Sequence, residues 1–337
     1  MSSIGWLIVS LGIILVGAEV FVNGVEWLGK KLDLSEGAVG SVLAAVGTAL
    51  PETIIPIIAI LFGNNGVGHE IGIGAILGAP LMLATLAMFV TGAAVIIFRR
   101  RRDHGIKVVA HYSTMARDLS FFIVVYLVAV LTGFFPTEWR TMQLVIASLM
   151  IIAYFIYVFV MIKEERDVND DEDIPPCYFA RKQESPHLLI ILFQVLTALV
   201  FIILGANLFV DSVKEVATLY AVPAFVLAII ITPIATELPE KFNSVIWVSR
   251  EKDTLALGNI TGAMVFQSSL IPAIGIFLTD WQLSAGALLS AGLALASALF
   301  IYIELLRKKH ITAGMLLMGG LFYLLFILGV IEGFISW

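Results

Sequence analysis

Long apolar runs, separated by short polar segments, recur from one end of the chain to the other. Each run reaches roughly the 20 residues that an α-helix needs to cross the hydrocarbon core of a bilayer. The pattern predicts ten membrane-spanning helices, at about residues 4–24, 36–62, 70–98, 118–135, 139–162, 188–210, 220–249, 254–279, 282–306 and 311–335. No intervening loop has room for a soluble domain, so the sequence predicts an all-α polytopic membrane protein.

The composition agrees with this interpretation. Hydrophobic residues make up 60% of the 337 residues, charged residues only 14%, and the mean hydropathy is +1.00. Soluble domains contain about 25% charged residues. The first apolar run follows Met1-Ser2-Ser3 without a basic segment or a small-residue cleavage site, so we expect a retained helix rather than a cleaved signal peptide. We therefore expect a multi-pass protein of the cell (plasma or inner) membrane.

Lysine and arginine are distributed unevenly between alternate loops. If the N-terminus lies outside, the inner loops contain 17 of the 20 basic residues: Lys30, Lys31, Arg99 to Arg102, Lys107, Arg117, Lys163, Arg166, Arg181, Lys182, Arg250, Lys252, Arg307, Lys308 and Lys309. The outer loops contain Arg140 and Lys214, and Lys241 falls inside a span. Basic loops remain on the cytoplasmic side, so the pattern predicts that the N-terminus and the C-terminus both lie outside.

One connecting segment carries most of the negative charge. The net charge of −6 arises mainly from Glu164, Glu165, Asp167, Asp170, Asp171, Glu172 and Asp173. We expect residues 163–187 to form a solvated, acidic cytoplasmic linker between a first five-helix repeat (residues 1–162) and a second (residues 188–337). A regulatory cation site in this linker is the alternative. The single cysteine, Cys177, lies in the linker and excludes an internal disulfide.

The two halves of the chain repeat each other. A shift of 188 residues pairs Thr48 with Thr236 and the string Leu-Pro-Glu at 50–52 with the same string at 238–240. After a change of four residues in loop length, the glycines at 74 and 78 match those at 258 and 262. Because five crossings per half is an odd number, the two halves insert upside down relative to each other. Inverted repeats of this kind are typical of secondary transporters, which hold their substrate near the membrane midplane.

Each repeat places a proline and an acid where neither favours a simple span. Pro51 and Pro239 lack an amide hydrogen and deprive the carbonyl four residues earlier of its helical partner. Glu52 and Glu240 fall near the middle of their spans, where an ionised side chain costs on the order of 3 kcal/mol. Carboxylates, carbonyls and threonine hydroxyls form the oxygen ligand set that hard divalent cations such as Ca²⁺ prefer. The alternative is that the prolines only kink packed helices and that the acids are protonated or paired with Lys241.

These motifs resemble the paired alpha repeats of the calcium/cation antiporter superfamily, the sodium/calcium exchanger family, in its prokaryotic form. The first family signature, Gly-Thr-Ser-x-Pro-Glu, is matched at residues 47–52 and 235–240. The second signature, roughly Gly-Asn-x-x-Gly-Ser-Asn-x-x-Asn/Asp, is matched at residues 258–267 and more weakly at residues 74–83. The resemblance implies the fold of these exchangers, with ten helices in two inverted five-helix repeats. It also implies a metal site in which Glu52 and Glu240 bind calcium and Thr48 and Thr236 add backbone oxygens.

Departures from the family pattern concern the coupling ion. The family serines expected to bind sodium are here Ala49, Glu237, Ala79 and Ala263, and the polar residues that close the second signatures are Leu83 and Gln267. Most side-chain oxygens of the flanking sodium sites are therefore missing. Glu237 adds a third carboxylate that could carry a proton. Lys241 is either an internal counter-ion or paired with another acid, and Asn259 and Gln267 remain candidates for coupling or modulation.

We therefore expect a secondary active antiporter that exchanges a divalent cation, Ca²⁺ in the first place, for Na⁺ or H⁺ by alternating access at a midplane site. A proton-coupled exchanger of Ca²⁺, Mg²⁺ or Mn²⁺ is the alternative within this class. An intramembrane di-acid protease using Glu52 and Glu240 is the alternative from another class, although no His-Glu-x-x-His or Gly-x-Ser-x-Gly motif occurs. We expect a transporter and not an enzyme.

The partners follow from this interpretation. We expect the lipid bilayer and small inorganic cations as partners, no nucleic acid and no obligatory protein partner. No cofactor is expected, since Ca²⁺ and Na⁺ (or H⁺) are transported substrates. Glu19 and Asn23, with their equivalents Asn207 and Asp211, lie near span ends, where we expect solvation at the interface; an access path is the alternative. The paired glycines of the second signatures are expected to serve close helix packing.

Overall fold

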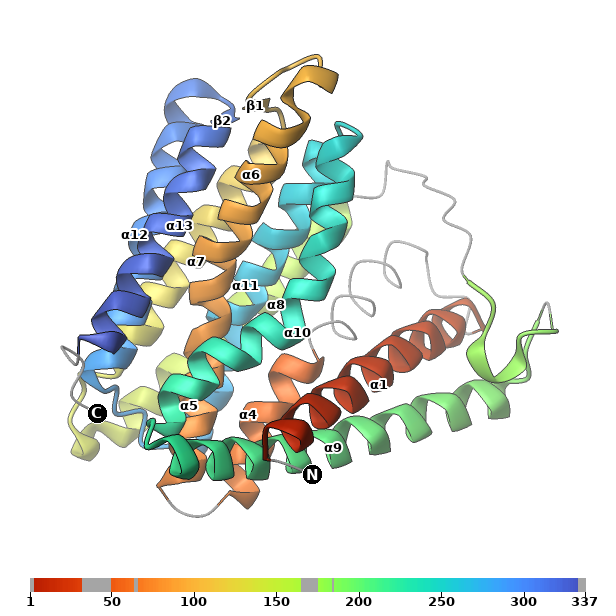
Figure 1. Ribbon diagram of the computed structural model, residues 1–337, viewed down its shortest axis with the longest axis vertical. Coiled ribbons are helices and arrows are strands. Elements are labelled where there is room, and N and C mark those ends of the chain that lie inside the picture. Colours follow the sequence, from red (N-terminus) through yellow and green to blue (C-terminus); the bar gives the residue numbers. More distant parts are fainter. Residues whose placement is uncertain (1–2, 32–49, 64–65, 165–174, 184, 333–337) are drawn as a thin grey trace.

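Helices account for nearly all of the described chain (Figure 1). The computed structural model describes residues 3–31, 50–63, 66–164, 175–183 and 185–332. The first half contains α1 (Ser3–Lys31), α4 (Leu50–Phe62), α5 (Val67–Met82), the π-helical turn η2 (Leu83–Ala87), α6 (Met88–Phe98), α7 (Tyr112–Thr132) and α8 (Arg140–Glu164). The second half contains α9 (Leu188–Tyr220), α10 (Ala224–Ser249), α11 (Asp253–Leu278), α12 (Ala285–Lys308) and α13 (Ala313–Ile331). Short 3₁₀ turns occur at Arg99–Arg101, Thr137–Trp139 and Tyr178–Ala180.

The prediction of ten spans is confirmed. Eight helical segments in the described part are long and apolar enough to cross a bilayer, and two shorter apolar stretches, Pro51–Phe62 and Ala224–Ile234, belong to α4 and α10. α5, η2 and α6 follow one another without a break and form one span. The first part of the predicted second span, up to residue 49, lies outside the described residues.

The junction between α5 and α6 is a local widening of the helix, the π-helical turn η2. Pro80 lies inside α5, and its missing amide hydrogen disturbs the regular hydrogen bonds of this turn. The amide of Leu83 donates to the carbonyls of Ala79 and Pro80, and η2 begins at Leu83. The Thr85 hydroxyl donates to the carbonyl of Leu81. Local π-helical turns of this kind occur frequently at functional sites.

The inverted two-fold relation between the halves is visible in the contact of α1 with α9, which lie side by side (Figure 1). A Cβ atom placed on Gly17 would lie 2.9 Å from Cγ1 of Ile202, and one placed on Gly205 would lie 2.8 Å from Cγ1 of Ile14. Gly17 and Gly205 are equivalent under the 188-residue shift, and so are Ile14 and Ile202. The two helices therefore pack through a reciprocal pair of glycine contacts, as small residues at membrane helix interfaces permit.

The buried apolar residues form one large core and two smaller clusters, and α1 and α9 belong to the smaller clusters. A large core lies among α5 to α8 and α10 to α13. A smaller core joins the first half of α1 and the second half of α9 to α4, α5 and α10; it includes Leu7, Ile14, Ile55, Ala206, Phe209 and Val213. At the other end of the pair, Trp27, Cys177, Ala180 and Ile191 form a third cluster. In Figure 1 this end of α1 and α9 extends away from the bundle.

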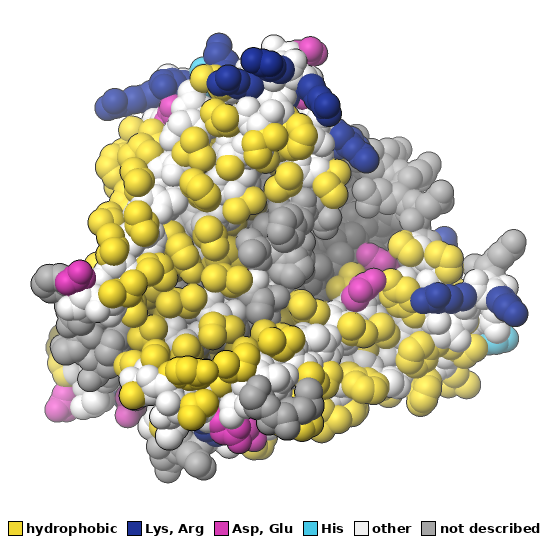
Figure 2. All heavy atoms as spheres, in the orientation of Figure 1, with side chains coloured by type: hydrophobic (Ala, Val, Ile, Leu, Met, Phe, Trp, Pro, Cys, Tyr) yellow, Lys and Arg dark blue, Asp and Glu magenta, His cyan; other side chains and the backbone are white. Residues whose placement is uncertain are grey.

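The basic residues gather at one end of the bundle. Strand β1 (Lys107–Val108) follows α6, and it pairs with the antiparallel strand β2 (Ile311–Thr312), which precedes α13. Figure 2 shows Lys and Arg side chains around this end, while hydrophobic side chains cover much of the visible flank below it. α1 begins and α13 ends toward the opposite end (Figure 1). We refer below to the end that contains β1 and β2 as the basic end.

A buried ion pair fastens the basic end. The side chains of Arg102 and Asp253 are buried, and the guanidinium donates to both carboxylate oxygens, at 2.8 Å from Nη1 and 2.7 Å from Nη2. The guanidinium also donates to the carbonyls of Val248, Lys107 and Gly105. The amide of Val109 donates to Asp253. The loop after α6 is thereby held against the turn between α10 and α11.

Candidate functional site

The first Pro-Glu string begins the described part of the second span. Pro51 stands in the first turn of α4, where a proline fits because its missing amide hydrogen leaves no helical bond unmade. Glu52 lies in the same turn and is only 4% exposed. An acid in the first turn also interacts favourably with the positive end of the helix dipole. The structure thus places the predicted carboxylate of the first repeat inside the protein. Thr48 lies outside the described residues.

The second Pro-Glu string differs from our expectation of an interrupted helix. α10 continues from Ala224 to Ser249, through Pro239. The ring of Pro239 still provides no amide hydrogen for the carbonyl of Ala235. The side chains of Glu240 and Lys241 lie outside the described part, so their predicted roles stay predictions. Tertiary packing on both sides of α10 explains why the helix persists, since packing routinely overrides local propensity.

Two further predicted residues of α10 are buried beside this string. Glu237 is 3% exposed, and Thr236 is buried as well. The Thr236 hydroxyl donates to the carbonyl of Thr232 at 2.9 Å. Its oxygen can still accept a hydrogen bond or bind a cation. Helices α4, α10 and α11 contact one another and α5. Glu52, Thr236 and Glu237 therefore come from elements that meet in one part of the bundle.

Among the described residues, Thr232 of α10 and Gln267 of α11 each have a buried side-chain oxygen, Oγ1 and Oε1, without a hydrogen-bond partner, and the two lie at a similar depth. Ser244 of α10 donates to the carbonyl of Ala256 of α11, which fixes the register of these two helices. Thr232 and Gln267 lie 12 and 11 residues from that contact, or roughly 17 to 18 Å along each helix. Buried polar atoms require partners, so this depth suits water or a cation.

The signature glycines serve close packing in one repeat. A Cβ atom on Gly74 would lie 2.8 Å from the carbonyl oxygen of Phe225, and one on Gly78 would lie 2.4 Å from that of Ile229. These contacts bring α5 and α10 together, as expected. Around the equivalent Gly258 and Gly262 of α11, a Cβ atom would meet no atom of the described chain within 4 Å. The expectation of close packing is therefore confirmed for the first repeat alone.

The residues that close and modify the second signature have different positions. Leu83 is fully buried at the start of η2, and Ala79 is buried one turn earlier in α5. Gln267 is buried in α11, whereas Asn259 is only partly buried. Within the described residues, no group of three or more His, Cys, Asp or Glu side chains is arranged to hold a metal ion.

Asn23 is a structural residue, contrary to our expectation of solvation at the interface. It is buried, and its amide donates to the carbonyl of Pro175 at 3.2 Å and accepts from the amide of Tyr178 at 3.1 Å. Trp27 donates to the same Pro175 carbonyl at 2.9 Å. Its equivalent in the second half, Asp211, is exposed and pairs with Lys214 at 3.2 Å. The expectation holds for Asp211 and is wrong for Asn23.

The segment 175–180, which we name the tether, contacts both α1 and α9. Oε1 of Gln194 accepts from the amide of Phe179 at 2.9 Å and from the thiol of Cys177 at 3.2 Å. Nε2 of Gln194 donates to Asn23 at 3.0 Å. The Tyr178 hydroxyl donates to Glu19 at 2.6 Å. The tether therefore binds the second half of α1 and the first turns of α9 into one unit.

Asp118 is a buried acid that sequence analysis did not single out. It belongs to α7, it is 2% exposed, and it accepts hydrogen bonds from Tyr157 and Thr261. The predicted span begins at residue 118, which places Asp118 at its very end. α7 begins six residues earlier, at Tyr112. An acid one and a half turns inside a span was the signal available in the sequence.

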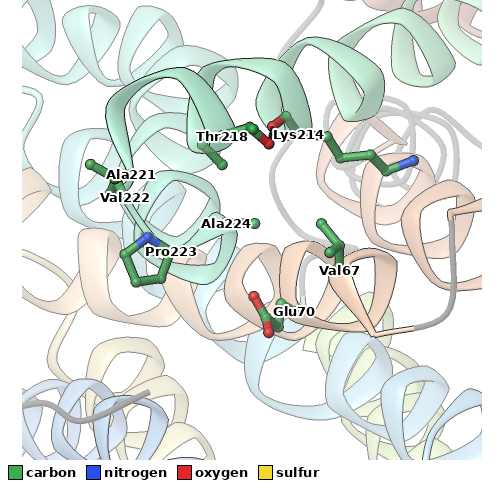
Figure 3. A pocket seen from close by; sticks show the side chains of 9 residues that line it. Val67, Glu70, Lys214, Thr218, Ala221, Val222, Pro223 and Ala224 are labelled. Carbon is green, nitrogen blue, oxygen red and sulfur yellow. Dashed lines mark hydrogen bonds between the residues drawn. The ribbon is translucent and has the colours of Figure 1, made fainter.

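An open pocket of about 490 Å³ lies at the end of the bundle opposite the basic end (Figure 3). Val67 and Glu70 of α5 line one side, and Lys214, Thr218 and the turn from Ala221 to Ala224 line the other. Of the predicted cation ligands, the two that the structure describes, Glu52 and Thr236, do not line it.

Comparison with known proteins agrees with the motifs. The sequence profile of the family described as sodium/calcium exchanger protein matches residues 2–163 and 190–331. The putative antiporter CaxA of Alkalimonas amylolytica is 22% identical over 331 residues, covering 95% of this chain and 98% of that protein. An uncharacterised membrane protein of Methanocaldococcus jannaschii is 24% identical over 282 residues, covering 81% of this chain and 80% of that protein. The crystal structure of the H⁺/Ca²⁺ exchanger CAX has the same fold, with a TM-score of 0.76 and 18% identity, covering 98% of this chain and 82% of that one.

Proposed function

The chain belongs to the sodium/calcium exchanger family, and on this premise we propose that it exchanges Ca²⁺ for a monovalent cation across the membrane. It is a multi-pass membrane protein and a secondary transporter. The burial of Glu52 and Glu237, from opposite repeats and inside membrane-spanning helices, is the observation that supports the proposal most. Buried acids in spans are costly and mark ion pathways. The intramembrane protease reading does not fit a family of transporters.

We assign the transported metal ion to Thr48, Glu52, Thr236 and Glu240. The burial of Glu52 and Thr236 supports this assignment, as does the carbonyl of Ala235, which Pro239 leaves without a helical donor. An all-oxygen set with two carboxylates suits Ca²⁺ at distances of about 2.3 to 2.6 Å, and Mg²⁺ less well because it demands octahedral geometry. Mn²⁺ is the other divalent cation that such a set accepts.

The proposal also concerns the identity of the coupling ion, Na⁺ or H⁺. The buried alanines at 79 and, in partial burial, at 263 offer no side-chain oxygen where the family pattern has serine. Buried Glu237 and the unpartnered oxygen of Gln267 stand nearby on α10 and α11. A carboxylate close to other carboxylates can take up a proton in place of a metal ion. These residues favour H⁺ as the coupling ion over Na⁺.

Alternating access requires two bodies that move relative to each other. The absence of α1 and α9 residues from the large core of the described chain supports α1 with α9 as one body and the remaining helices as the other. Reciprocal glycine contacts and the tether hold the pair together. The pair contacts α4, α5 and α10 through a small apolar cluster, which provides little directional resistance to sliding. We propose that both termini lie outside and that residues 163–187 form a cytoplasmic linker, as the basic end predicts.

The decisive experiment is a flux assay in proteoliposomes. Uptake of Ca²⁺, Mg²⁺ and Mn²⁺ is measured first with a Na⁺ gradient at equal pH on both sides, then with a pH gradient without Na⁺. We expect Ca²⁺ uptake with the pH gradient, and uptake with the Na⁺ gradient alone would assign the coupling to Na⁺. Failure of every divalent cation to move under either gradient would contradict the exchanger function itself.

A further inference from the structure

The carboxyl group of Asp118 joins three helices. Tyr157 of α8 donates to Oδ1 at 2.5 Å, and Thr261 of α11 donates to Oδ2 at 2.6 Å. Asp118 itself belongs to α7 and is nearly inaccessible to water. Each carboxylate oxygen therefore has one hydroxyl donor, and both donors are neutral. This group is distinct from Glu52, Thr236 and Glu237, which belong to α4 and α10.

Its depth follows from the register of α7 with α11. The amide of His111, just before α7, donates to Thr254 in the first turn of α11, and Thr261 donates to Asp118 seven residues further along both helices. Seven residues of helix rise about 10 Å. Asp118 thus lies well inside the membrane-spanning part, on the side of the basic end. A carboxyl at this depth is costly and marks an ion or proton pathway.

The charged surroundings of Asp118 are limited. Arg117, the preceding residue, is partly buried, and its guanidinium carbon lies 5.9 Å from the ring centroid of Tyr157. α8, α11 and α12 pack against α7, and Tyr157 is the titratable residue that they direct to Asp118 within the described chain. The positive charge of Arg117 acts electrostatically on the Asp118 carboxyl. Burial favours the neutral carboxyl, whereas the two hydroxyl donors and Arg117 favour the charged one.

Thr261 has a second acceptor available. Six other threonines in the described helices, Thr85, Thr91, Thr132, Thr218, Thr236 and Thr279, donate to the carbonyl four residues earlier. Thr261 instead donates to Asp118, which leaves the carbonyl of Leu257 as its alternative acceptor. A protonated Asp118 can donate to Thr261, whose hydroxyl then turns to Leu257. Both protonation states therefore have complete hydrogen bonds.

We propose that Asp118, with Tyr157 and Thr261, is a second proton-binding site that loads and empties during exchange. The proton comes from water at the basic end, binds the carboxylate and returns to water, so no other reactant is consumed. Thr261 lies between Gly258 and Gly262 in the second signature, next to the partly buried Asn259. A change of protonation therefore alters the bond that holds this segment of α11 to α7. The inference rests on the proposed antiport.

The test separates proton binding from transport. Infrared difference spectra of the purified protein between acid and alkaline pH record the carbonyl band of protonated carboxyl groups. We expect one component of this band to be lost in Asp118→Asn and retained in Asp118→Glu. Thr261→Val changes the pH at which that component titrates, whereas Thr261→Ser, which keeps the hydroxyl, leaves it in place. An unchanged band in Asp118→Asn overturns the proposal, whatever the fluxes are.

Transport completes the test. We expect Asp118→Asn to lower Ca²⁺ uptake driven by a pH gradient by about tenfold, the effect of losing one hydrogen bond to a charged group. Ca²⁺/Ca²⁺ exchange without a gradient needs no proton and stays within about twofold of the unmodified protein, a change below 0.5 kcal/mol. Loss of the band component with unchanged pH-driven uptake would also overturn the proposal. If the unmodified protein moves no Ca²⁺, the proposed function fails, and the infrared band still decides the proton site.

Discussion

The guanidinium of Arg102 donates two parallel N–H···O hydrogen bonds to the carboxylate of Asp253, although 151 residues separate the two in the chain. Both side chains are buried, and carbonyls and an amide saturate their remaining hydrogen-bond capacity. Because Arg102 follows α6 and Asp253 begins α11, the pair joins equivalent spans of the two repeats at the basic end.

Removing one partner of this pair leaves an uncompensated buried charge. We expect Arg102→Met to destabilise the protein by about 3 to 5 kcal/mol. Lys214→Met, which breaks the exposed pair with Asp211, is the matched control and costs about 0 to 1 kcal/mol. Thermal unfolding of both variants in the same detergent measures the difference. A similar loss of stability in the two variants would show that the buried pair contributes no more than the exposed pair.

Glu52 is expected to be indispensable for transport. Glu52→Gln keeps the size of the side chain but removes the charge that binds the cation, so we expect Ca²⁺ flux to fall by at least about a hundredfold, or 2.7 kcal/mol. Glu70→Gln is the control, since Glu70 is an exposed acid in the first turn of the next helix. Flux in proteoliposomes with equal amounts of inserted protein provides the measurement. Normal flux in Glu52→Gln would remove this residue from the site.

Gly78 sets the distance between α5 and α10. A methyl group there would lie 2.4 Å from the carbonyl oxygen of Ile229, and a backbone atom cannot move aside without shifting the helix. We expect Gly78→Ala to cost about 1 to 3 kcal/mol, the usual range for overpacking. Gly292→Ala, in the open surroundings of α12, is the control. The yield of monodisperse protein in size-exclusion chromatography distinguishes the two, and an equal yield would argue against a tight contact.

The labelling rate of Cys177 measures how firmly the tether is held in place. This single cysteine is buried, and its thiol donates to Gln194. Gln194→Ala removes two hydrogen bonds between the tether and α9 and two more between α9 and α1. We expect a membrane-permeant maleimide to label Cys177 at least about tenfold faster in this variant, which corresponds to 1.4 kcal/mol of protection. Asn207→Ala, also in α9 but away from the tether, keeps the slow rate; equal rates would contradict the role of Gln194.

The hydrogen bond from Tyr178 to Glu19 stabilises the tether only while the tyrosine is protonated. Its hydroxyl donates to Glu19, and this bond raises the pKa of Tyr178 above its ordinary value of 10.0. The raised pKa means that the bond stabilises the folded tether fully below pH 10.0 and is lost as the pH rises through the higher pKa. Ultraviolet titration of tyrosinate should show one group that ionises above pH 10.0 and disappears in Tyr178→Phe. Ionisation of that group at or below its ordinary pKa would exclude the bond.

The ten spans were predictable because lipid requires long apolar helices, and no packing detail enters that rule. Burial of Glu52 was predictable for the same reason, since an acid in the middle of an apolar run has no route to water. The burial of Asn23 was not predictable, because the carbonyl of Pro175, to which it donates, lies 152 residues away in the chain. Asp118 was missed because the start of α7 is polar, and the hydropathy pattern placed the span six residues too late. The continuous helix at Pro239 reflects contacts on both sides of α10 that no local rule contains.

The pairing of β1 with β2 fixes an order of events in biosynthesis. Lys107 and Val108 leave the ribosome when three spans have been made, but their partners Thr312 and Ile311 appear only after nine. The early loop therefore remains without its strand partner while most of the protein enters the membrane. Contacts between such distant segments form late and slowly. Closure of the basic end is thus a late step of assembly, and a chain that stops before residue 311 lacks it.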